Sequence, residues 1–182
     1  MSAPSTWVLR HSDLLVAGLR VLDVAAGDGR HARWLAARGC RVSAIDRAPA
    51  ALEALRLIPG IEVLDADIEA APWPLAPASF DVLLVPNSLH RPLFPVLATA
   101  LRPGGLLIYE TFMAGNERYG RPSSPAFLLR EGELLEAFAD FRVLAFEQGL
   151  RQGTVPRVVQ RLLALAPGGG PELPPLASDQ IH

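Results

Sequence analysis

Cysteine, histidine and long apolar runs are scarce in this sequence. Cys40 is its only cysteine, which excludes an internal disulfide. The four histidines stand far apart, at positions 11, 31, 90 and 182, so no spacing typical of zinc ligands is present. No apolar run approaches the ~20 residues that cross a bilayer, and the first residues lack the basic and apolar pattern of a signal peptide. We therefore expect a soluble, cytoplasmic protein that holds no metal.

An excess of positive charge is missing as well. The formal net charge is -2 and the pI is about 6.1, so the basic field that attracts nucleic acids is absent. With 182 residues and 50% hydrophobic content, the chain is long enough for one domain with a sizeable core. We expect this domain to span residues 1–166, followed by a disordered tail over 167–182, where proline and glycine occur without periodicity. Because of the negative net charge, large polyanions are not expected as partners, and the oligomeric state stays open.

The most informative stretch runs from Val21 to Ala32. Its first residues are strand-like, and a turn of small residues leads into helical spacing over Arg30–Arg38. Gly27 and Gly29 lack a Cβ, so the turn can lie against a ligand whose polar groups meet the amides at the helix start. The spacing Gly27-x-Gly29-x-x-Ala32 also fits the dinucleotide fingerprint, with alanine in the third place. The stretch therefore predicts a nucleotide-like ligand.

Strand-like and helix-like segments alternate along the rest of the chain, which is typical of an α/β protein with a parallel sheet. The expected strands are Val21–Val24, Cys40–Ile45, Ile61–Leu64, Phe80–Val85 and Leu106–Glu110, with Phe141–Glu147 and Val155–Leu165 as a closing antiparallel pair. The expected helices are Ser5–Gly18, Arg30–Arg38, Pro49–Leu57, Leu93–Leu101 and Leu128–Phe138, and Arg102–Gly105 is expected to be a turn.

Asp46 follows the second expected strand, about 20 residues beyond the glycine turn. An acid at this place can accept hydrogen bonds from the two hydroxyls of a ribose. It also stands shortly before Pro49, so capping of the next helix is a second role, and the two roles are compatible.

The residues that follow the fourth expected strand, Pro86 to Arg91, stand where an open parallel sheet holds its ligand. We expect reactive groups here. Histidine suits a general base for an acceptor that must lose a proton, which makes His90 a catalytic candidate, together with Asn87. Capping or packing of the helix that begins near Pro92 is the alternative role of His90.

A polar, glycine-rich loop begins at Thr111 and runs to about Pro125. Long loops of this kind are usually functional, and we expect this one to be a mobile cover over a substrate pocket. The candidates for substrate contact are Glu110, Arg118, Tyr119 and Arg121.

Two motifs resemble those of the class I S-adenosylmethionine (SAM) dependent methyltransferases. Asp23, Ala25, Gly27 and Gly29 resemble motif I of that family, acid-x-Gly-x-Gly-x-Gly, with alanine in place of its first glycine. The Leu-Arg-Pro-Gly-Gly turn over 101–105, which leads into an apolar strand, resembles a second mark of the family. The resemblance spans Val21 to Glu110 and points to small bacterial enzymes of the tellurite-resistance-like or type 11–12 kind.

The resemblance implies a Rossmann-like, doubly wound, mostly parallel sheet of seven strands with a terminal antiparallel strand. It implies SAM as the cofactor, with the adenine held by Asp67 and Ile68, for which Asp65 is an alternative to Asp67. The residues expected to bind SAM are Asp23, Ala25, Gly27, Gly29, Asp46, Arg47, Asp67, Ile68 and Pro86.

The activity that the resemblance implies is methyl transfer from SAM to a small molecule that the sequence does not identify. The sequence around Asn87 matches neither Asn-Pro-Pro-Tyr nor Pro-Cys, the motifs of nucleic-acid methyltransferases, which argues against base methylation. Two alternatives stay open: an NAD-binding Rossmann oxidoreductase, and a SAM-binding regulatory protein without catalytic activity.

Overall fold

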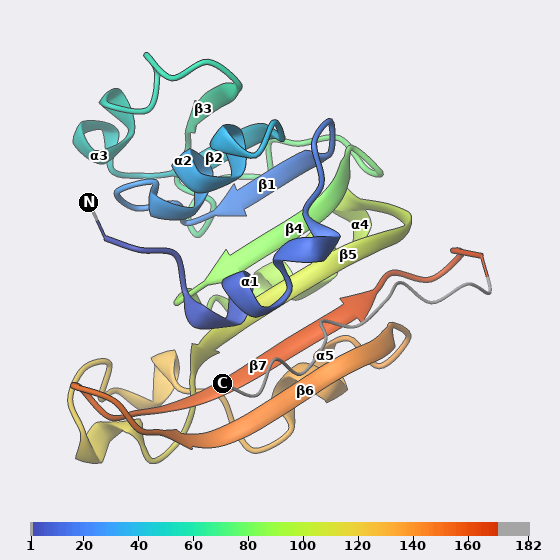
Figure 1. The fold of residues 1–182 in the computed structure, drawn as a ribbon. Coiled ribbons are helices and arrows are strands. Elements are labelled where there is room, and N and C mark those ends of the chain that lie inside the picture. The colour runs from blue at the N-terminus through green and yellow to red at the C-terminus, as the bar shows by residue number, and fades with distance from the viewer. Residues whose placement is uncertain (1, 171–182) are drawn as a thin grey trace.

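A computed structural model describes residues 2–170 and consists of a seven-stranded sheet with helices on both faces (Figure 1). The strand order is β3-β2-β1-β4-β5-β7-β6. The strands are β1 Arg20–Val24, β2 Arg41–Asp46, β3 Ile61–Asp65, β4 Phe80–Pro86, β5 Leu101–Phe112, β6 Arg142–Arg151 and β7 Arg157–Leu165. The helices are α1 Thr6–Arg10, α2 Arg30–Ala37, α3 Pro49–Glu53, α4 Phe94–Ala100 and α5 Glu133–Ala137.

The direction of the strands agrees with the sequence prediction. The first five strands pair in parallel, and β7 runs antiparallel between β5 and β6. The expected closing antiparallel pair is therefore confirmed, as is the Rossmann-like, mostly parallel sheet of seven strands. The apolar runs of β1 and β4 form central strands because both of their faces are covered.

Two apolar clusters cover the two faces of the sheet. Trp7 of α1 and Leu35 of α2 are fully buried against the face that carries Val21 and Leu84. Leu97 of α4 and Leu134 of α5 pack on the opposite face, as do Phe138 and Tyr109. Figure 1 shows α1 and α2 in front of the sheet and α5 behind it. We call the first of these faces the α1 face.

Three expected helices are shorter in the structure, and contacts between distant residues explain why. The prediction of one helix over Ser5–Gly18 was wrong, since α1 ends at Arg10. Arg38 donates hydrogen bonds to the carbonyl oxygens of Ser12 (3.1 Å) and Leu15 (3.3 Å), which holds this part of the chain in another conformation.

The expected helices Pro49–Leu57 and Leu128–Phe138 are also reduced to single turns or little more. Leu52 within α3 and Leu55 just after it are both buried while Leu57 is 88% exposed, so the chain follows its core contacts rather than a regular helix. Leu129 forms a parallel bridge with Met113, which keeps the start of the second segment extended.

The expected turn Arg102–Gly105 lies within β5 as an irregularity of the strand. Phe80 pairs with Leu101, and the next pair is Val82 with Leu106, so four residues of β5 bulge out between the two pairs. Gly104 has a φ of +72°, which glycine adopts without strain.

The predicted domain boundary at 166 stays a prediction. The amide of Gly104 donates to the carbonyl oxygens of Ala166 (3.2 Å) and Pro167 (3.3 Å), so the chain is still attached to the sheet there. The tail predicted over 167–182 falls largely on 171–182, which lie outside the described residues. Within the described range, no helix is long and apolar enough to cross a membrane.

Candidate functional site

The carboxyl ends of the parallel strands meet along one edge of the sheet. The chain passes from β1 to β2 on one side and from β4 to β5 on the other, so the order of the strands reverses between β1 and β4. Open α/β sheets hold their ligands at such a reversal. The loops after β1, β2 and β4 therefore define the candidate site.

The loop after β1, residues 25–29, which we call the motif loop, has the conformation that a glycine-rich ligand loop requires. Ala25, Gly27 and Gly29 all have positive φ values, of 54°, 57° and 70°. A Cβ at Gly29 would come within 2.4 Å of the Leu55 side chain, so only glycine fits there. At Gly27 a Cβ would meet nothing within 4 Å, which leaves the backbone of the loop open on that side.

Asp46 at the end of β2 connects this loop to the next one. Its Oδ2 accepts a hydrogen bond from the amide of Gly27 (2.8 Å), and its Oδ1 accepts one from the amide of Ala48 (2.9 Å). Ala48, not Asp46, is the N-cap residue of α3, so the predicted capping role is reduced to a turn contact before the helix. A carboxylate has about four acceptor positions, so both oxygens can accept further hydrogen bonds.

A cleft of about 160 Å³ brings several of the predicted cofactor residues together. Asp67 is in the cleft and holds its own loop, since its Oδ1 accepts from the amides of Glu69 (3.0 Å) and Ala70 (3.2 Å). Asp65 pairs with Asp46 in the sheet but is exposed and does not line the cleft. The cleft is lined by Ala25, Asp46, Arg47, Ala66, Asp67, Ile68, Glu69 and Ser88.

Asp23, the acid of motif I, lies beneath the loop and not in the cleft. It is fully buried, and neither carboxylate oxygen has a hydrogen-bond partner among the described residues. Burial raises the pKa of Asp23 to about 8, although the amide of Ala32 and the charge of Arg30 act in the opposite direction. A buried polar group without a partner is uncommon in proteins and here marks the base of the motif loop.

The N-terminal segment crosses the start of α2, a contact that the sequence did not predict. The amide of Ser5 donates to Nε2 of His31 (3.1 Å), Ser2 donates to Asp28 (2.7 Å), and Arg30 reaches the carbonyl of Ala3 (3.4 Å). Burial lowers the pKa of His31 to about 4, so its imidazole is neutral and can accept the Ser5 hydrogen bond. Residues 2–5 thus lie against the motif loop.

β4 ends at Pro86, which is buried beside β5, and the loop that follows begins at Asn87. Asn87 has a φ of +55°, and its amide donates to the carbonyl of Glu110 (2.7 Å) while its side chain is exposed. Ser88 lines the cofactor cleft, and its carbonyl accepts a hydrogen bond from the hydroxyl of Tyr109 (3.0 Å). His90 is half-buried and precedes a short 3-10 turn that leads into α4.

Glu110, a predicted substrate contact, is engaged in an ion pair within the protein. Its Oε2 lies 2.5 Å from Nε of Arg161, and both side chains are more than 90% buried. Arg161 also pairs with Glu147 (3.1 Å), which in turn pairs with Arg10 of α1. These four side chains carry no net charge and attach α1 to β5, β6 and β7.

The other predicted substrate residues, Arg118, Tyr119 and Arg121, are exposed on the loop after β5 and do not line the cofactor cleft. Asn116 holds this loop against β7. Its Nδ2 donates to the carbonyl of Pro122 (3.0 Å), and its Oδ1 accepts from the amide of Val158 (3.1 Å). The prediction that the loop moves stays a prediction.

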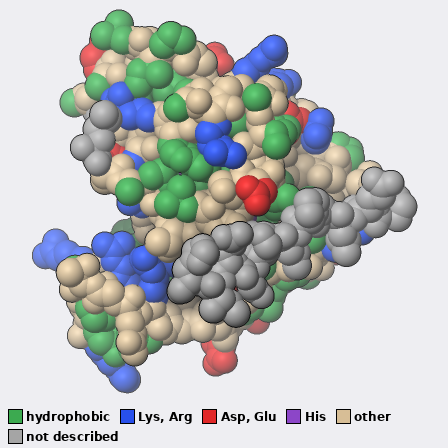
Figure 2. All heavy atoms as spheres, in the orientation of Figure 1, with side chains coloured by type: hydrophobic (Ala, Val, Ile, Leu, Met, Phe, Trp, Pro, Cys, Tyr) green, Lys and Arg blue, Asp and Glu red, His purple; other side chains and the backbone are tan. Residues whose placement is uncertain are grey.

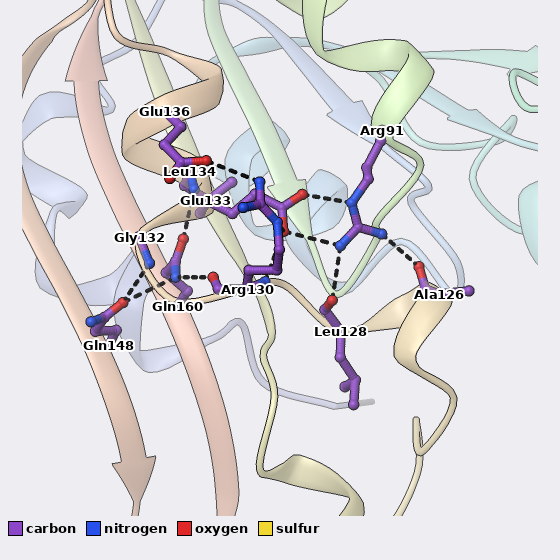
Figure 3. A network of polar contacts seen from close by, with 10 residues as sticks. All are labelled: Arg91, Ala126, Leu128, Arg130, Gly132, Glu133, Leu134, Glu136, Gln148 and Gln160. Atoms are coloured by element: carbon purple, nitrogen blue, oxygen red, sulfur yellow. Dashed lines mark hydrogen bonds and ion pairs between the residues drawn. The ribbon is translucent and has the colours of Figure 1, made fainter.

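Arg91, next to His90, organises a polar network that sequence reasoning missed (Figure 3). It binds both carboxylate oxygens of Glu133, at 2.5 and 3.0 Å, and the carbonyls of Ala126 (3.0 Å) and Leu128 (2.9 Å). Behind it, Gln160 of β7 accepts from the amide of Leu134 (2.7 Å). The network fixes the loop after β4 to the start of α5. Arg91 and its partners lie about 40 residues apart in sequence, so no local pattern indicated the network.

Comparisons with known proteins agree with this geometry. A profile of the family described as Methyltransferase domain matches residues 21–105, a range that includes the motif loop, Asp46 and Asp67. The Ubiquinone biosynthesis O-methyltransferase of Xylella fastidiosa (strain 9a5c) is 39% identical over 106 residues, which are 53% of this chain and 43% of that protein. The match therefore spans less than half the length of that relative.

Solved structures share the fold at low sequence identity. TehB from Haemophilus influenzae matches with a TM-score of 0.74 and 18% identity, over 91% of this chain and 63% of that chain. The Burkholderia thailandensis 1,6-didemethyltoxoflavin-N1-methyltransferase, solved with 1,6-didemethyltoxoflavin and S-adenosylhomocysteine bound, matches with a TM-score of 0.65 and 20% identity, over 88% of this chain and 76% of that chain. The profile match covers the part of the chain that carries the motifs, and the solved structures share its fold, so these comparisons agree with the family, enzyme class and cofactor that the motifs predict.

Proposed function

We propose that this chain, a member of the class I SAM-dependent methyltransferases, binds SAM and transfers its methyl group to a small-molecule acceptor. The single observation that carries the proposal is the cleft at the carboxyl ends of β1 and β2. There Ala25 of the glycine loop, Asp46, Asp67 and Ile68 meet, and the amide of Gly27 donates a hydrogen bond to Asp46.

The residues of the cleft fit the parts of SAM. Asp46 has acceptor positions left for the two ribose hydroxyls. Asp67 has its Oδ2 available for the adenine amino group, since within residues 2–170 its one ion-pair partner there is Arg47, at 3.9 Å. The amide of Ile68 would meet the adenine ring. The open backbone at Gly27 would receive the methionine end, beside the start of α2, where helix amides and carboxylates interact favourably.

Bound SAM supplies a methyl group that is already activated by the positive sulfur, so the protein needs no covalent intermediate. The work of the chain is to orient the acceptor and to exclude water. Residues 2–5 contribute to the second task, because they cover the side of the motif loop next to Asp28 and His31.

His90 and Asn87 are the proposed catalytic residues. Both stand in the loop after β4, next to Ser88 of the cleft, and neither the His90 imidazole nor the side-chain carboxamide of Asn87 has a hydrogen-bond partner among the residues described. His90 would remove the proton that a hydroxyl or ammonium acceptor must lose. Asn87, whose backbone is held by Glu110, would orient the acceptor.

An O-methylation acceptor is favoured by the curated relative, whose name is that of an O-methyltransferase. The alternative of an NAD-dependent oxidoreductase is disfavoured by topology. Dinucleotide-binding sheets have the order 3-2-1-4-5-6, whereas here an antiparallel β7 stands between β5 and β6. A SAM-binding regulator would share the cleft but would have no use for an exposed polar loop after β4.

Calorimetry with SAM and with NADH is the direct test of the cofactor. We expect SAM to bind and NADH not to bind, and the reverse result would refute the proposal. A screen of hydroxyl, amine and thiol acceptors then tests methyl transfer, with release of S-adenosylhomocysteine as the readout. Binding of SAM with no turnover in a broad screen would favour the regulator.

A further inference from the structure

An open groove of about 590 Å³ lies on the α1 face of β6 and β7. Residues directly opposite one another in an antiparallel pair point to the same face of the sheet. The pairs here are Glu147 with Arg161, Gly149 with Val159, and Arg151 with Arg157. Leu163 and Leu165, in the same alternation as Arg157 and Arg161, pack in the α1-face cluster, which places all three pairs on that face.

The two ends of the groove differ in charge. At one end Arg161 is neutralised by Glu110 and Glu147. At the other, Arg151 lines the groove, and Arg157 stands directly opposite it on β7; both are exposed. Neither guanidinium has an ion-pair partner anywhere in the part of the chain that the structure describes, and Arg157 lies 5.8 Å from the centre of the Phe112 ring. Like charges opposite each other destabilise a sheet, and a bound anion would remove that repulsion.

The floor between the two ends is small and apolar. Gly149 has no side chain, and a Cβ there would meet nothing within 4 Å. Its neighbour Val159 pairs on its other side with Phe112 of β5. A slender apolar body can therefore lie between the charged ends. In Figure 2 basic side chains gather on this side of the molecule, near α1 and the start of β7.

The sheet connects the groove to the site at which methyl transfer is proposed. Pro86, the last residue of β4, pairs with Glu110, and Glu110 pairs with Arg161 of β7. Two strand spacings and four residues along β7 separate Pro86 from Arg157, or about 16 Å with standard strand dimensions. The volume is also in the range of small-molecule sites, about 300–1,000 Å³.

We propose that this groove binds the methyl acceptor, and that the acceptor is an elongated organic anion. Its carboxylate, or another planar anion, would lie between Arg151 and Arg157, its apolar body over Gly149 and Val159, and its reacting atom near His90. The inference deepens the proposed function and rests on it, because only a methyltransferase gives the ligand of the groove the role of a methyl acceptor. Paired guanidinium groups suit a carboxylate because each presents two parallel donors.

The test uses octanoate as the anionic probe and octanamide as its neutral analogue, with amide NMR of the full chain as the readout. We expect octanoate to shift the amide signals of Gly149 and Val159 saturably, and octanamide to bind at least about tenfold more weakly. The double variant Arg151→Gln/Arg157→Gln should weaken octanoate about tenfold, the sum of two modest exposed ion pairs. An amide spectrum that is unchanged outside the groove shows that the double variant is folded.

A matched control is available at the amino ends of β1 and β2. Arg20 and Arg41 also stand opposite each other, on β1 and β2, and Arg20 lies 5.8 Å from the centre of the Phe80 ring. Arg20→Gln/Arg41→Gln should leave octanoate binding unchanged. The inference is overturned if octanoate causes no saturable shifts, if octanamide binds equally, or if the two double variants behave alike. SAM calorimetry on the same samples separates its failure from that of the proposed function.

Discussion

Replacement of Asp46 by alanine is the sharpest test of the cofactor cleft. The carboxylate already accepts the amides of Gly27 (2.8 Å) and Ala48 (2.9 Å), and its remaining acceptor positions would receive two ribose hydroxyls. Loss of these charge-assisted hydrogen bonds costs about 1.5–3 kcal/mol of binding free energy. Asp46→Ala should therefore weaken SAM about tenfold to a hundredfold, as measured by calorimetry.

Two companion variants separate ribose binding from support of the loop. Asp46→Asn keeps one oxygen acceptor and nearly the same shape, so it should weaken SAM less than alanine does. Asp65→Ala removes an equal charge from the neighbouring position on β3, outside the cleft, and should leave affinity unchanged. Urea unfolding shows whether each variant is folded. Wild-type SAM affinity in folded Asp46→Ala would show that Asp46 is not part of the site. A loss of SAM affinity in Asp65→Ala would show that Asp65, and not the acid assigned here, makes the adenine or ribose contact.

Four further predictions concern catalysis, motion and stability. His90→Ala should lower turnover about a hundredfold, with SAM affinity unchanged, once an acceptor is found; a variant that retains most of its turnover would exclude the base role. Hydrogen exchange over Thr111–Pro125 should slow when SAM and acceptor bind, and equal protection in both states would exclude a lid. Glu110→Ala should lower the free energy of unfolding in urea by about 3 kcal/mol, because it leaves Arg161 buried with one partner fewer; a loss below about 1 kcal/mol would contradict this. Burial raises the pKa of Asp23 to about 8, so between pH 4 and 8 the folded state binds a proton that the unfolded state has released, and stability falls as pH rises. Asp23→Asn should remove that fall in the melting temperature; identical pH profiles would show that the carboxyl is not protonated.

The order of elements and the motif loop were readable from the sequence because both depend on neighbouring residues. Strand periodicity and glycine positions predicted β1, β2 and the loop between β1 and α2 to within one or two residues. Ala25 shows the limit of such local reasoning. The motif has glycine there, and the structure holds this alanine at a φ of 54°, a conformation that costs an ordinary residue about 1–2 kcal/mol.

Helix lengths were predicted less well, because contacts with remote parts of the chain shorten two of the three expected helices. Arg38 binds the carbonyls of Ser12 and Leu15, and the bridge between Met113 and Leu129 holds the start of another segment extended. Such contacts outweigh helix propensity, which amounts to a few tenths of a kcal/mol per residue.

The sequence by itself determined the α/β order and the acids that meet at the cleft, since strands, turns and strand ends follow from local spacing, and its motifs indicate the methyltransferase family. Only the tertiary structure decided which polar side chains pair with one another inside the protein. Glu110 and Arg161 lie 51 residues apart and form a buried pair, and the pairing of β5 with β7 sets them opposite each other. Register between distant strands depends on the packing of the whole sheet, and for that reason no stretch of sequence carries it.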